Sequence, residues 1–92
     1  MIIVSQDKTM VINFENVEII GVGNPLENDL GKFPIVITTI SDNEYPIAIY
    51  ETEERVKEVL QEIVSKYKTT LYNSKTNETV VNVPKVYEMP KE

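Results

Sequence analysis

The chain contains no cysteine and no histidine. Without cysteine it can form no disulfide, and without either residue the usual zinc sites and Cys- or His-based nucleophiles are excluded within one chain. Histidine is also the side chain that ordinarily titrates near neutrality, so acid–base catalysis would need a carboxylate, lysine or tyrosine with a strongly shifted pKa. We therefore expect no catalytic residue, no metal site, no cofactor and no enzymatic activity.

Positive charge is scarce in the first half of the chain. Residues 1–51 carry two lysines against eight acidic residues, which accounts for the whole net charge of −6, and arginine occurs once, as Arg55. A protein that tracks a DNA or RNA duplex needs a basic stripe, so this class is excluded. One small anionic ligand held by a few local donors is still compatible with this charge distribution.

Long apolar runs are also missing. No segment approaches the length of a membrane span, and the first residues do not have the pattern of a signal peptide. We therefore expect a cytoplasmic protein with no membrane partner. The 92 residues suffice for a single domain, 1–92, with a small core. Such a domain would gain stability from association, so we expect a homo-oligomer.

Isoleucine and valine are abundant, 23 residues against 4 leucines, and β-branched residues favour pleated sheets. Turn residues divide the chain into short strands, with a loop over 23–33. Within 17–22 we expect Val17 and Ile19 on one face and Ile20 on the other. Pro46 lacks an N–H donor, which favours an edge position for its strand. The predicted strands are a β-meander over 1–6, 9–14 and 17–22, a hairpin of Pro34–Ile40 with Tyr45–Glu51, and a hairpin of Thr70–Ser74 with Thr79–Val83.

One amphipathic helix is predicted from Glu53 to Tyr67 or Lys68. Thr52 is a suitable N-cap, and apolar residues recur at helical spacing at positions 56, 59, 60, 63, 64 and 67, with Leu60 at the centre of the stripe. One such stripe packed on a sheet makes a two-layer domain. The expected fold class is α+β, an antiparallel sheet of about five to seven short strands with one main helix packed on a face.

Three residues are the candidates for binding a ligand. Arg55, at the start of the predicted helix, could clamp a phosphate, and Tyr50 and Tyr87 could stack on a base. The alternative is that Arg55 pairs with a nearby carboxylate and that the tyrosines only pack. The acidic residues at 51, 53 and 54 could suggest a metal or acid–base cluster, but acids that open a helix more often complement its dipole.

Three segments of the chain resemble a known family. The start Met-Ile-Ile-Val-Ser-Gln-Asp-Lys, the stretch from Tyr50 to Leu60 and the Val-Tyr-Glu-Met-Pro segment at 86–90 resemble short proteins of phages and prophages of Gram-positive bacteria. That family includes anti-Thoeris anti-defence proteins, which act as sponges for cyclic ADP-ribose-type signals, and some of which hold cyclic oligonucleotides. The resemblance implies an oligomeric, non-enzymatic protein that acts inside an infected bacterial host.

Two functions from different classes follow as hypotheses. The leading one is a phage anti-defence protein that binds and sequesters a cyclic nucleotide immune signal without cleaving it. The alternative is a phage accessory module that binds a host protein through its acidic sheet face. An enzyme that degrades the signal is the least favoured, because the chain has no His, no Cys and no metal constellation.

Overall fold

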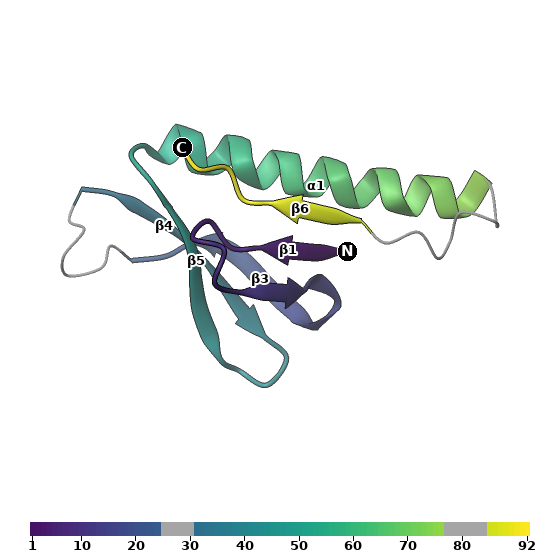
Figure 1. Cartoon of the computed structure of the whole chain (residues 1–92), viewed down its shortest axis with the longest axis horizontal. Coiled ribbons are helices and arrows are strands. Elements are labelled where there is room, and N and C mark those ends of the chain that lie inside the picture. Colours follow the sequence, from purple (N-terminus) through teal and green to yellow (C-terminus); the bar gives the residue numbers. More distant parts are fainter. Residues whose placement is uncertain (25–30, 77–84) are drawn as a thin grey trace.

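The computed structural model describes residues 1–24, 31–76 and 85–92, with side chains placed up to Tyr67 and again from Lys85. Its elements form a small α+β fold in which one long helix lies over the strands (Figure 1). The fold class expected from the sequence is therefore confirmed. The elements are β1 (Ile2–Val4), β2 (Val11–Asn13), the 3-10 turn η1 (Phe14–Asn16), β3 (Val17–Val22), β4 (Phe33–Thr39), β5 (Glu44–Tyr50), α1 (Glu53–Thr76) and β6 (Val86–Glu88).

The six strands found among the described residues are divided between two three-stranded sheets. The first has the order β2-β1-β6, with β2 antiparallel and β6 parallel to β1, and the second is the antiparallel order β3-β4-β5. The two sheets touch where the Gln6 N–H donates to the Ile47 carbonyl over 2.8 Å. The chain ends meet in the first sheet, so β6 depends on contacts across the length of the sequence.

The core lies between α1 and the two sheets. Its fully buried side chains come from β1, β4, β5, α1 and the segment after β6, and the helix contributes Val56, Val59 and Ile63. Phe14 and Tyr67 meet edge to face, with ring centroids 5.5 Å apart. Met89 is 2% exposed, so the last segment is anchored in its own chain. No helix in the described ranges is long and apolar enough to span a membrane.

The predicted three-strand meander is wrong in one respect, because β3 does not pair with β2. The Asn13 side chain accepts from the Glu15 N–H over 3.0 Å and caps η1, which turns the chain out of the first sheet. Strand β3 then pairs with β4. The assignment of faces was also wrong, because a register shift between Val17 and Ile19 leaves Ile19 59% exposed and packs both Val17 and Ile20 against the core.

The hairpin of β4 and β5 is confirmed, and Pro46 lies in an edge strand as expected. A second register shift, between Ile35 and Val36, interrupts the alternation of faces along β5. As a result Ile47 and its neighbour Ala48 are both buried, although consecutive strand residues ordinarily face opposite sides.

The helix begins at Glu53 as predicted, and the Thr52 hydroxyl accepts from the Arg55 N–H over 3.1 Å. It ends at Thr76, which is well beyond the predicted end, so the predicted strand over 70–74 is wrong. Its predicted partner over 79–83 lies outside the described residues. The most buried positions of the stripe are Val56, Val59 and Ile63, whereas Leu60 is half-buried and Val64 is exposed.

Candidate functional site

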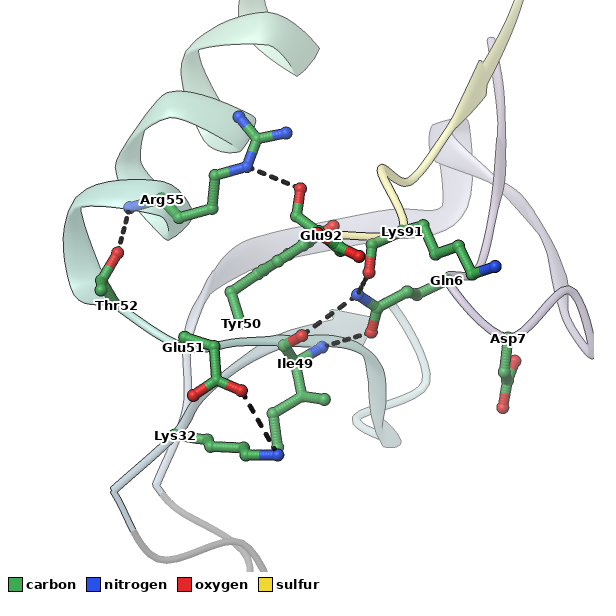
Figure 2. Close-up of a pocket in the computed structure, with 10 residues that line it drawn as sticks. All are labelled: Gln6, Asp7, Lys32, Ile49, Tyr50, Glu51, Thr52, Arg55, Lys91 and Glu92. Carbon is green, nitrogen blue, oxygen red and sulfur yellow. Dashed lines mark hydrogen bonds and ion pairs between the residues drawn. The ribbon is translucent and has the colours of Figure 1, made fainter.

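A hollow of about 660 Å³ lies where β5 ends, α1 begins and the C-terminal segment returns to the sheet (Figure 2). Ten residues from four parts of the chain line it. Three of them are cationic and three are anionic, so the lining is neutral in a chain whose net charge is −6. The lining residues are Gln6, Asp7, Lys32, Ile49, Tyr50, Glu51, Thr52, Arg55, Lys91 and Glu92.

Gln6 holds the floor of this hollow together. The two N–H groups of its Nε2 are shared among the carbonyl oxygens of Ile49, Pro90 and Lys91, at 3.1, 3.2 and 2.8 Å, and its Oε1 accepts from the Ile49 N–H at 2.8 Å. The side chain thus bonds to the edge strand β5 at Ile49. This amide joins the turn after β1, strand β5 and the C-terminal segment at one point.

Arg55 reaches the hollow from the first turn of α1. Its Nη1 lies 3.0 Å from Glu58 Oε1 and 3.7 Å from Glu62 Oε2, and its Nε donates to the main-chain oxygen of Glu92 over 2.9 Å. The hydrogen bond to Glu58 is the main reason that the pKa of Arg55 is raised. In Figure 2 the guanidinium points toward Glu92 and away from the Lys32–Glu51 ion pair, whose atoms are 3.5 Å apart.

Tyr50 lies beneath Arg55, with the guanidinium carbon 5.9 Å from the ring centroid. Its residue is 3% exposed, and its hydroxyl donates to the Pro90 carbonyl over 2.7 Å. Burial raises the pKa of the Tyr50 hydroxyl to about 12. Because the ring is covered on both sides by its own chain, it supports Arg55 and the C-terminal segment and offers little face to a base.

Tyr87 lies on β6 and borders a separate hollow with Gln61, Glu62 and Lys66. Its hydroxyl donates to Glu62 Oε1 over 2.6 Å. Burial is the largest cause that raises the pKa of Tyr87, and this hydrogen bond is the second largest. Glu62 therefore connects Tyr87 to Arg55. Of the three residues predicted from the sequence, Tyr50 and Arg55 share one hollow and Tyr87 borders the next.

The raised pKa of Tyr50 predicts a loss of stability at high pH. The unfolded state releases the phenol proton near the ordinary pKa of 10.0, whereas the folded state keeps it until about 12, so ionisation favours unfolding between these values. Denaturant melts at pH values on either side of this window give the free energy of unfolding. Between them this free energy should decrease more for the parent than for Tyr50→Phe. Tyr45→Phe, at a 41% exposed tyrosine, is the control. An equal decrease with pH for the parent and Tyr50→Phe would contradict a raised pKa at Tyr50.

The sequence did not single out Gln6, Lys32 or Lys91 as residues of the site. Lys32 could have been found, because it is one of two cations in the first half of the chain. Gln6 carries no local signal, because its role depends on partners 43 to 85 residues away. Among the described residues no group of His, Cys, Asp or Glu side chains is arranged to hold a metal ion. Comparison with protein-family models, with curated proteins and with solved structures finds no match for this chain.

Proposed function

We propose that this protein binds a phosphate-bearing nucleotide signal and sequesters it without cleaving it. The observation that carries the proposal is the neutral hollow at the start of α1, which Lys32, Arg55 and Lys91 line from three parts of an acidic chain. Its volume of about 660 Å³ is within the range of small-molecule sites. The resemblance of the helix start and of the C-terminal segment to anti-defence sponges supports a cyclic ADP-ribose-type or cyclic oligonucleotide ligand.

A phosphate would have to exchange with carboxylates that already contact these cations. Glu51 faces Lys32, and Glu58 and Glu62 face Arg55; their side chains are 80%, 65% and 49% exposed. Exposed ion pairs of this kind contribute about 0–1 kcal/mol each, so replacing them costs little. A phosphate also offers Arg55 a bidentate partner, which is stronger than a single contact. The proposed site is therefore filled by exchange of weak pairs for a stronger one.

The titrating groups support binding without catalysis. Among the described residues, the groups with shifted pKa values move away from neutrality. The pKa values of Asp7 and Glu88 are lowered, mainly by hydrogen bonds from Thr9 and Lys8, and those of Tyr50, Tyr87 and Arg55 are raised. General acid–base catalysis works best with a pKa near the operating pH. This direction of shift favours a ligand that is held and later released unchanged.

The central test is isothermal titration calorimetry with cyclic ADP-ribose isomers and cyclic dinucleotides. We expect the parent to bind one of them, and Arg55→Ala to weaken binding by about 10- to 100-fold, which corresponds to loss of charged hydrogen bonds. Lys57→Ala is the matched control, because it removes one positive charge from the same helix at a side chain that is 73% exposed and outside the hollow.

The ligand should be recovered intact after the protein is denatured, and light scattering should show a homo-oligomer. Because Met89 is buried within its own chain, association would have to use other apolar side chains, such as the exposed Val64 and Val86. If the parent binds none of these compounds, the sequestration proposal is wrong. If Arg55→Ala and Lys57→Ala bind equally well, the ligand occupies another site.

A further inference from the structure

Strand β2 is an edge strand whose free side is open. Residues Met10 and Phe14 bond to β1, through Ser5 N–H to the Met10 carbonyl at 2.9 Å and Phe14 N–H to the Met1 carbonyl at 3.0 Å. In an antiparallel ladder the intervening residues direct their main-chain groups to the other side. Val11 and Asn13 are therefore turned away from β1, and within the described chain β2 has no second strand neighbour. Val11 is 71% exposed.

A groove of about 440 Å³ runs beside this edge, between β2 and the β4–β5 hairpin. We call it the β2 groove. Its wall opposite β2 consists of Ile37, Thr39 and Tyr45, and Tyr45 is 41% exposed. A second hollow continues it, sharing Asn16, Thr39 and Tyr45 and adding the 67% exposed Ile40. An extended peptide can add to a sheet as a further strand where there is a free strand edge and, beside it, pockets for its side chains.

The charged side chains around the β2 groove are acidic, and one of them, Glu15, lies 3.6 Å from the N-terminal ammonium of Met1. Residues 9–31 and 33–54 contain no lysine or arginine. Four exposed carboxylates lie on the segments that line the groove or continue directly from it, namely Glu15, Glu18, Asp42 and Glu44. The nearest cation along the chain, Lys8, is paired with Glu88 at 2.7 Å. A partner segment would be attracted here only if it brought positive charge.

We propose that the β2 groove binds an extended segment of a partner protein that alternates apolar and polar residues and is flanked by lysine or arginine. The segment adds as a strand to β2, with its main chain on Val11 and Asn13 and its apolar side chains against the exposed Tyr45 and Ile40. A second copy of this chain fits less well, because its own strand segments around β2 and the hairpin are acidic. The groove is separate from the hollow at Arg55, so this proposal does not depend on the nucleotide proposal.

The test is an NMR titration of the ¹⁵N-labelled protein with a synthetic peptide of alternating valine and threonine that has two lysines at each end. We expect saturable binding, with the largest shifts at the amides of Val11 and Asn13. Two control peptides should each bind with an affinity at least about tenfold lower. One has glutamates in place of the lysines, and the other is N-methylated at alternate amides. Equal binding of all three peptides, or no binding of the first, would overturn the proposal.

Val11→Pro tests the edge from the protein side. The Val11 N–H points away from β1, so proline removes a donor to the partner without removing a bond of the existing sheet. We expect an unchanged unfolding midpoint and a peptide affinity that is at least about tenfold lower. If Val11→Pro does not fold, Glu44→Lys provides a second test. This variant should bind the lysine-flanked peptide more weakly and the glutamate-flanked peptide more tightly than the parent does. Protection of the Val11 amide by self-association would instead assign the edge to a second copy.

Discussion

Truncating Ile63 to alanine should lower the free energy of unfolding by about 2–5 kcal/mol, whereas truncating its neighbour Val64 should change it by about 0.5 kcal/mol or less. Ile63 is 1% exposed and faces the core, while Val64 is 44% exposed on the same turn of α1. The difference arises because the buried methyl groups leave a cavity that the surrounding sheets cannot fill. Both substitutions replace a β-branched residue of α1 with alanine, so the change in helix propensity is similar in the two variants.

Urea or guanidinium melts of Ile63→Ala and Val64→Ala measure this difference directly. Equal losses would mean that α1 packs on the sheets through another face. A much smaller loss at Ile63 would mean that the core repacks around the missing atoms. Far-ultraviolet circular dichroism should show that both variants keep the helix before denaturation.

Removing the Gln6 amide should cost about 2–4 kcal/mol, because Gln6→Ala leaves partly buried main-chain groups of β5 and the C-terminal segment without partners. The carbonyl oxygens of Ile49, Pro90 and Lys91 lose the two N–H groups that they share, and the Ile49 N–H loses an acceptor. Lys8→Ala is the comparison, because its ion pair with Glu88 also joins the first turn to the C-terminal segment but is exposed. That pair should contribute about 1 kcal/mol or less.

Gln6→Glu separates hydrogen bonding from packing. A carboxylate has nearly the same shape as the amide but cannot donate, and it would face the carbonyl oxygens of Ile49, Pro90 and Lys91. We expect Gln6→Glu to be at least as destabilising as Gln6→Ala, and limited proteolysis should cut the C-terminal segment sooner in both. A stable Gln6→Glu protein would show that the side chain acts mainly through its volume.

The residues of the candidate site were only partly accessible to prediction. Arg55 was identified because it follows the Thr52 cap and is the only arginine. Helical spacing already places Glu58 and Glu62, three and seven residues further on, on the same face as Arg55, but the sequence could not show that Tyr50 would be buried below the guanidinium. Burial is set by the C-terminal segment, which crosses Tyr50 through the hydrogen bond to Pro90. Such a contact joins residues 40 apart and has no local signature.

The sequence by itself determined the local elements of this protein. Periodicity and the Thr52 cap set where α1 begins, and turn residues with β-branched runs set the β4–β5 hairpin, because these signals act over a few residues. The tertiary structure decided which strands pair. Strand β3 pairs with β4 instead of β2, and β6 pairs with β1. Register shifts expose Ile19 and bury Ile47 next to Ala48. Strand pairing is decided by burial across distant segments, where a shift of one residue reverses every face.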